Sequence, residues 1–174
     1  MKTTKLLSIL LLLLITMACG DDDDDDNNDT SMDDSEFFQS PEDIVVNTHN
    51  EYRSAVGAPD IEWSDELADS AAEWALILSE ECILQHSDTE FGENLWLGTE
   101  GAFTLGESIR FWGDEIDFYD VESNECVGGE CLHYTQMVWS ETRAVGCGAA
   151  LCNGLLILVC QYDPPGNIIG QRPF

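Results

Sequence analysis

Six of the seven cysteines lie in the last hundred residues of this 174-residue chain, and they limit its fold more than any other feature. They are Cys82, Cys126, Cys131, Cys147, Cys152 and Cys160. In an exported chain, an even number of cysteines points to disulfides, although the spacing leaves their pairing open. Zinc held by thiolates is the alternative, but the chain has no pair of C-x-x-C motifs. We therefore expect a domain stabilised by three disulfides.

The N-terminus indicates export. Two lysines precede an apolar stretch over residues 6–15, which is too short to span a bilayer comfortably and is typical of a signal peptide, predicted over residues 1–18. A small residue directly before Cys19 resembles the lipobox of bacterial lipoproteins. We therefore predict lipidation of Cys19, with an ordinary cleaved signal peptide as the alternative, because Thr16 stands where a lipobox usually has Leu. Firm anchoring would require more than one acyl chain.

An acidic segment follows over residues 19–37. It contains six consecutive aspartates, Asp21 to Asp26, which repel one another and predict an extended, disordered tether. A calcium loop is the alternative, but the run lacks the glycine and the spaced ligands of such a loop. Residues 38–174 remain, which is enough for one domain with its own core.

The chain is strongly acidic, with 35 Asp and Glu, 6 Lys and Arg, and a formal net charge of −29. Ten of the acidic residues precede Gln39, which leaves 25 for the domain, against four arginines. Such a surface repels phosphate, so nucleic acid is excluded as a partner. Anionic lipid is repelled as well, and contact with a membrane is expected only through the lipid on Cys19.

The domain alternates helix and strand signals. Ser40-Pro41-Glu42-Asp43 is typical of a capped helix start, and this helix is expected to end at Gly57. Ser64 is expected to cap a second helix, and a third is predicted over residues 103–119. The buried face of the second helix is predicted to contain Leu67, Ala71, Trp74, Ala75 and Leu78, and that of the third Leu105, Ile109, Trp112 and Ile116.

Strands are predicted over residues 93–97, 145–149 and 155–162. The last of these is apolar almost throughout, which is typical of a central strand. Helices on both sides of a small sheet give an α+β fold, a three-layer α/β/α sandwich.

Four motifs occur in order along the domain: His49-Asn50-x-x-Arg53, Gly92-Glu93-Asn94-Leu95, the segment 133–139 (HYTQMVW) and the segment 159–167 (VCQYDPPGN). Together with the six cysteines, they resemble the CAP superfamily of cysteine-rich secretory proteins, antigen 5 and plant pathogenesis-related proteins of the first class, which share the SCP domain. The resemblance covers residues 41–174, and the C-terminal tail is most similar to the plant class. Leu132 departs from the pattern, because the family usually has Gly before this His.

The resemblance implies the CAP-type sandwich and the disulfides Cys82–Cys152, Cys126–Cys131 and Cys147–Cys160. It also implies a cavity lined by His86, Glu93, Glu115 and His133, with His86 and His133 as metal ligands. Imidazole suits Zn²⁺, and carboxylates can complete the shell or orient the rings. Each residue also has a structural alternative; Glu93, for example, could simply hold a loop through backbone amides. His49 lies on the apolar face of a helix and is interpreted as a core histidine bonded to backbone.

Three functions remain open. The first is an extracellular binding module for a lipid or sterol, or for a protein or glycan. The second is a metal-dependent hydrolase with Glu93 or Glu115 as base, and the third is a structural or adhesive surface protein. The chain has neither a His-Glu-x-x-His helix nor a Gly-x-Ser-x-Gly elbow, and its cysteines are assigned to disulfides. These absences favour the binding module over an enzyme.

Overall fold

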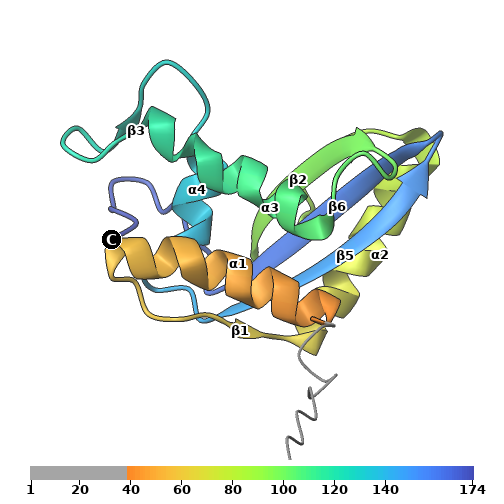
Figure 1. Ribbon diagram of the computed structural model, residues 1–174, viewed down its shortest axis with the longest axis horizontal. Helices are drawn as coiled ribbons and strands as arrows, with labels where there is room; N and C mark the ends of the chain where they lie inside the picture. The colour runs from red at the N-terminus through yellow and green to blue at the C-terminus, as the bar shows by residue number, and fades with distance from the viewer. Residues whose placement is uncertain (1–38) are drawn as a thin grey trace, which may run out of the picture. The chain divides into compact units, whose positions relative to one another are not determined.

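This computed structural model describes residues 39–174, which form helices around a four-stranded sheet (Figure 1). The elements are α1 (Pro41–Val56), β1 (Glu62–Trp63), α2 (Asp65–Glu81), β2 (Gly92–Thr99), α3 (Leu105–Gly113), the 3₁₀ helix η2 (Asp114–Phe118), β3 (Tyr119–Asp120), β4 (Glu125–Cys126), α4 (Leu132–Met137), β5 (Ala144–Cys152) and β6 (Leu155–Asp163). The predicted signal peptide (1–18), the lipidation site Cys19 and the acidic tether (19–37) lie outside the described residues. None of the helices between residues 39 and 174 is both long enough and apolar enough to cross a membrane.

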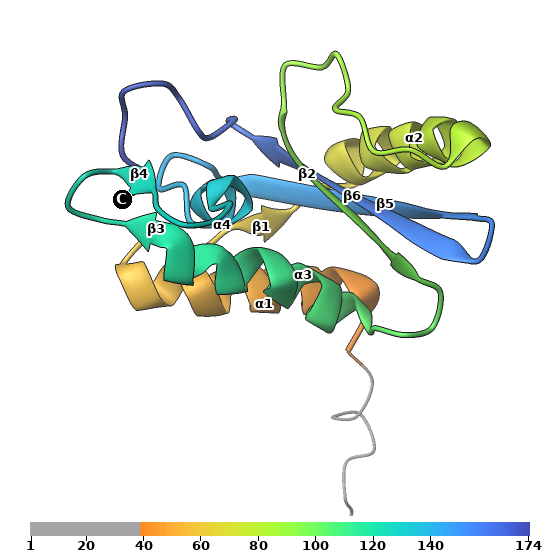
Figure 2. The same ribbon diagram turned by 90° about the horizontal axis from the view of Figure 1, so that it is seen from above.

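The main sheet has the order β1-β5-β6-β2, with β1 parallel to β5 and the other pairs antiparallel. The apolar strand β6 therefore lies inside the sheet, as its sequence predicted. Helix α2 covers one face, and α1 and α3 cover the other (Figure 2). The predicted three-layer α/β/α sandwich is confirmed.

The first two helices begin where their caps predicted. Ser40 accepts a hydrogen bond from the backbone of Asp43, and the Asp43 carboxylate accepts one from the backbone of Ser40. This reciprocal pair satisfies two amides that the helix itself leaves unpaired. Gly57 ends α1 with a φ of 73°, a conformation that glycine adopts without strain.

The third predicted helix is correct at its start but not along its whole length. Thr104 caps α3, which ends at Gly113, and the chain continues through η2 as a tighter 3₁₀ turn. Because a 3₁₀ helix has three residues per turn, the register of the buried face shifts after Gly113. Ile109 and Trp112 are buried as predicted, whereas Ile116 is 44% exposed, so its prediction as a core residue is wrong.

Helix α2 lies very close to β5 because the residues that meet there, on both elements, have small side chains. A Cβ atom added to Gly146 would lie 2.2 Å from the backbone nitrogen of Ala68, and one added to Gly148 would lie 2.3 Å from the Cα of Ala72. Strand β5 therefore needs glycine at both positions. Of the five residues predicted to face inward from α2, Leu67, Ala71, Ala75 and Leu78 are buried, while Trp74 is half-buried.

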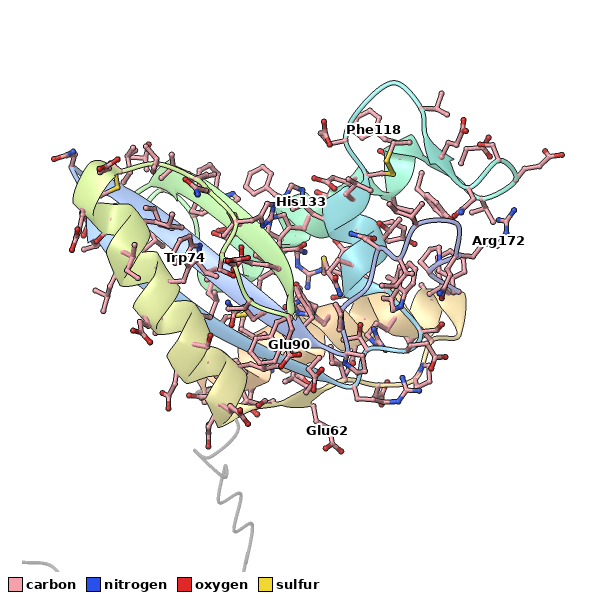
Figure 3. All side chains as sticks on the ribbon, turned by 180° about the vertical axis from the view of Figure 1, so that it is seen from behind. Glu62, Trp74, Glu90, Phe118, His133 and Arg172 are labelled. Atoms are coloured by element: carbon pink, nitrogen blue, oxygen red, sulfur yellow. A yellow bond between two sulfur atoms is a disulfide. The ribbon has the colours of Figure 1, made fainter. Side chains whose placement is uncertain are left out.

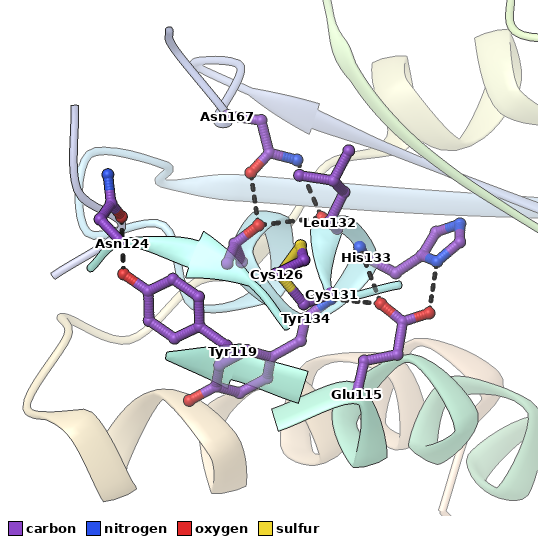
Figure 4. Close-up of a disulfide and its surroundings, with 10 residues drawn as sticks. Glu115, Tyr119, Asn124, Cys126, Cys131, Leu132, His133, Tyr134 and Asn167 are labelled. Carbon is purple, nitrogen blue, oxygen red and sulfur yellow. Dashed lines mark hydrogen bonds and ion pairs between the residues drawn. A yellow bond between two sulfur atoms is a disulfide. The ribbon is translucent and has the colours of Figure 1, made fainter. Parts of the chain in front are cut away.

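Three disulfides join the described elements, with the pairing that the family resemblance implied. Cys82–Cys152 links the end of α2 to the end of β5, and Cys147–Cys160 crosses between β5 and β6. Cys126–Cys131 closes a short loop directly before α4 (Figure 4). The last of these lies next to His133 in the sequence and limits how far the start of α4 can move.

Candidate functional site

A buried arginine organises the irregular chain that follows α4. The Arg53 guanidinium is fully buried and donates to the carbonyls of Pro59, Met137, Trp139 and Thr142, each at 2.7–2.9 Å. Burial lowers the pKa of Arg53 to about 10, and the group remains charged at neutral pH. Its partners are carbonyls, so the arginine serves to satisfy backbone groups that no helix or strand pairs.

A second buried network connects the core to His133. His49 is buried and donates from Nδ1 to the carbonyl of Val45 at 2.8 Å, as expected for a core histidine. Its Nε2 therefore accepts from the Tyr162 hydroxyl at 2.9 Å. Asn94 donates to that hydroxyl and to the carbonyl of His133, both at 3.1 Å.

Burial lowers the pKa of His49 to about 4, a direction that the nearby charge of Arg53 supports, and burial raises the pKa of Tyr162. Both groups are therefore neutral at ordinary pH. The order of donors and acceptors in the network then has one consistent assignment, with the Tyr162 proton directed at His49. This chain of bonds holds the backbone of His133 in one place.

Glu115 fixes the side chain of His133. One oxygen of the carboxylate accepts from His133 Nδ1 at 2.6 Å, and the other accepts from the backbone amides of His133 and Tyr134 (Figure 4). These amides belong to the first turn of α4, so the carboxylate also caps that helix. The His133 ring stacks on the buried ring of Trp112, with centroids 6.1 Å apart.

Glu93 holds the side chain of His86 in the same manner as Glu115 holds that of His133. Its Oε1 accepts from His86 Nδ1 at 2.9 Å and from the amide of Ser87 at 3.0 Å, while Gln161 donates to Oε2 at 3.2 Å. The carboxylate is 4% exposed, but the His86 side chain is 66% exposed. Glu93 thus has both roles considered from the sequence: it holds the loop through the amide of Ser87, and it contacts His86.

The two histidines line one hollow of about 250 Å³, together with Glu93, Asn94, Glu130, Leu132 and Asn167. His133 lies at the end of α4 that faces β2 (Figure 3), and His86 lies in the loop before β2. Since each Nδ1 donates to a carboxylate, each Nε2 is left as the free ring nitrogen. Glu115 lies behind His133 and does not line the hollow.

A metal here would have few protein ligands. Between residues 39 and 174, no three His, Cys, Asp or Glu side chains come close enough together to hold an ion. The carboxylate–histidine pairing is nevertheless the arrangement that orients metal-binding imidazoles. A Zn²⁺ ion at this hollow would have two imidazoles as protein ligands, each oriented by a carboxylate, and its remaining positions would fall to water or a ligand.

Sequence reasoning missed three lining residues, Asn94, Glu130 and Asn167, as contributors to the hollow. Asn94 and Asn167 lie within two of the recognised motifs, so a signal was present but pointed to no role. Glu130 directly precedes Cys131, and nothing in its local sequence indicates that the disulfide loop places it at the hollow.

Two plant proteins are similar to this chain in sequence. Pathogenesis-related protein 1B of Nicotiana tabacum is 38% identical over 142 residues, which cover 80% of this chain and 84% of the relative. The basic form of pathogenesis-related protein 1 from the same plant is 43% identical over 136 residues, covering 78% and 76%.

Solved structures share the fold. Venom allergen-like protein 4 of Schistosoma mansoni matches with a TM-score of 0.63 and 26% identity, covering 79% of this chain and 95% of that one. Na-ASP-1 matches with a TM-score of 0.65 and 25% identity over 78% of this chain, although the match spans only 41% of that protein.

The model of the CAP family, described as the cysteine-rich secretory protein family, matches residues 46–162, which contain all four sequence motifs except the end of the last. This match and the plant relatives establish the family, and the solved structures share its fold. The chain therefore belongs to the cysteine-rich secretory protein (CAP) family.

Proposed function

We propose that this protein is an exported binding module whose hollow between His86 and His133 holds a divalent cation, Zn²⁺, and a ligand. The observation that carries the proposal is the matched orientation of the two imidazoles. Each is held at Nδ1 by a carboxylate, and each leaves Nε2 free at the same hollow. Zn²⁺ bound there would supply a Lewis acid to a donor atom of the ligand.

Export and anchoring are part of the same proposal. Three disulfides favour an oxidising compartment outside the cytoplasm. The sequence before Cys19 favours a bacterial lipoprotein tethered to a membrane by its lipid. Cys19→Ser should then move the protein from the membrane fraction to the soluble fraction, and an unchanged distribution would contradict anchoring through this residue.

Binding is favoured over hydrolysis by the state of the two carboxylates. Glu93 and Glu115 each accept three hydrogen bonds, one of them from the histidine that each orients. Three accepted hydrogen bonds occupy most of the roughly four lone-pair sites of a carboxylate and stabilise its charged form, which makes it a weaker general base. Both carboxylates are instead engaged as positioning groups for the rings.

The test replaces both histidines by asparagine. The amide Nδ2 of Asn can take the place of imidazole Nδ1 as donor to Glu93 and Glu115, while Nε2 is removed. Calorimetric titration of the full chain with Zn²⁺ should show one binding event that His86→Asn with His133→Asn abolishes. Because the Asp21–Asp26 run is present in both proteins, any heat from it cancels in the difference.

Thermal unfolding of the double variant serves as the control for folding. A double variant that folds and binds Zn²⁺ with the same heat as the wild type would overturn the proposed cation site. A sterol or fatty acid and an extracellular protein or glycan are the ligand classes to be compared.

A further inference from the structure

A second hollow lies beside the histidine hollow. It has a volume of about 320 Å³ and lies between the start of α4, the β3–β4 hairpin and the C-terminal tail. Leu132 and Asn167 line both hollows and mark the boundary between them.

The backbone of Leu132 is held in place by a hydrogen bond from the C-terminal tail. Asn167 donates to the carbonyl of Leu132 at 2.8 Å and accepts from the Thr135 hydroxyl at 2.6 Å (Figure 4). The Leu132 side chain is 55% exposed. Because this backbone is already fixed, contact with a partner would cost only the rotamer freedom of the side chain.

The tail presents a second exposed apolar group beside it. Gln171 donates from its backbone to the carbonyl of Ile168, and Gly170 has a φ of 83°, the pattern of a type II turn. The corner of this turn is Ile169, which is fully exposed, and Ile168 is 42% exposed. Turn corners usually carry polar residues, Gly or Pro, so an isoleucine here favours a contact surface.

The tail is tied down on both sides of the turn. Gly166 donates to the Gln136 side chain at 2.9 Å, the Asn124 side chain donates to the carbonyl of Gln171 at 3.0 Å, and Ser140 donates to the carbonyl of Pro173 at 2.7 Å. The turn is therefore a fixed part of the domain.

The charge around these apolar groups selects the partner. Among residues 39–174, no Lys or Arg lines either hollow, whereas the exposed carboxylates of Glu125 and Glu130 line one hollow each. The domain as a whole has 25 acidic residues against four arginines. Anionic lipid and nucleic acid are repelled by such a surface, and a sterol carries no positive charge that could pair with the two carboxylates.

We propose that the surface formed by Leu132, Ile168 and Ile169 with Glu125 and Glu130 docks an extended segment of a partner protein in which basic and apolar residues alternate. The apolar side chains of the segment would pack on Leu132 and Ile169, and its basic side chains would pair with the two carboxylates. This inference rests on the proposed binding function and names its partner class.

Fluorescence anisotropy with a labelled peptide alternating lysine and leucine tests the proposal on the full chain. The peptide should bind, and Leu132→Ser with Ile169→Ser should weaken its affinity at least about tenfold. Leu76→Ser is the matched control, because Leu76 is 62% exposed on α2, in the opposite layer, and should leave the affinity unchanged. Glu130→Gln should weaken binding at low salt, whereas Glu73→Gln on α2 should not.

Two further peptides separate docking from general attraction to an acidic protein. A lysine–serine peptide of equal charge should bind more weakly and be insensitive to Leu132 and Ile169, and a glutamate–leucine peptide should not bind. Equal binding of the lysine–serine and lysine–leucine peptides would overturn the proposal. So would binding of cholesterol, in place of the peptide, that depends on Leu132 and Ile169.

The Zn²⁺ titration keeps the two proposals distinguishable. Zinc binding without peptide binding would overturn the docking surface and leave the cation site standing. Peptide binding that depends on Leu132 and Ile169, without zinc binding, would overturn the cation site and leave the docking surface standing.

Discussion

The two faces of the main sheet are packed by different means. On the α2 face, small and aliphatic side chains dominate the core, among them Ala71, Ala75, Leu78, Ile157 and Val159, and Gln161 is the buried polar side chain at one end, where it donates to Glu93. On the other face, the apolar core surrounds buried polar groups. These are His49, Arg53, Asn94, Thr142 and Gln136, together with the hydroxyl of Tyr162.

The difference follows from what each face must hold. Helix α2 and the strands satisfy their own backbone groups, so close packing is enough to join them. The other face also holds α4 and the irregular chain after it, whose carbonyls need partners from elsewhere. His133 and Glu115 belong to this second face, so its polar network supports the site as well as the fold. Glu93 and Gln161, which hold His86, lie instead on the α2 side of the paired strands β2 and β6.

Of the substitutions considered, Arg53→Met should reduce stability most, because it removes the buried arginine from the polar network on the α1 and α3 side of the sheet. Four carbonyls lose a charged donor, and methionine fills the space without replacing any bond. We expect the free energy of unfolding to fall by about 4 kcal/mol, measured by urea unfolding.

Arg110→Met is the control for Arg53→Met. Arg110 pairs with Glu51 at 2.7 Å on the surface, where such pairs contribute about 0–1 kcal/mol. Equal losses in the two variants would show that the buried arginine has no special part in holding the chain after α4.

The buried His49 on the α1 and α3 side of the sheet should also make the stability of the protein depend on pH. His49 has a pKa of about 4 in the folded protein against 6.5 for an unperturbed histidine, so between these values the unfolded chain binds the additional proton. The contribution of His49 to the free energy of unfolding is therefore complete above pH 6.5. It decreases as the pH drops toward 4, by about 3 kcal/mol in total.

Urea unfolding at a series of pH values measures this dependence, with His49→Gln as the reference. The variant should be less stable at pH 7 but should lack this part of the slope. Carboxyl groups that titrate below pH 5 contribute equally to both proteins. Parallel curves for wild type and variant would mean that His49 is not the group responsible.

The α2 face should respond to volume alone. Gly148→Ala places a Cβ atom 2.3 Å from the Cα of Ala72 and should cost about 2 kcal/mol through overpacking, independently of pH. Gly106→Ala in α3 is the matched control, because its nearest neighbour would be at 3.5 Å. There, alanine should be neutral or stabilising by up to about 1 kcal/mol. A loss for Gly106→Ala as large as that for Gly148→Ala would contradict this account.

Much of the fold was accessible from sequence because it depends on local chemistry. Ser40 and Ser64 mark helix starts through side chains that bond amides within three residues, and the apolar run of β6 indicates an interior strand. Helix α4 was missed because it has six residues and no side-chain cap of its own; its amides are satisfied by Glu115, from another element. Ile116 was misassigned because helical periodicity cannot show where an α-helix tightens into a 3₁₀ turn.

The sequence by itself determined the layers, the acidic character and, through the family motifs, the identity of the paired His and Glu residues. Only the tertiary structure decided how these residues are used. The carboxylates face Nδ1 of each ring, and Leu132 and Ile169 come to lie beside the same hollow. The physical reason is that helix caps and strand patterns act over a few residues. A ring orientation or a docking surface instead depends on hydrogen bonds between segments far apart in the chain.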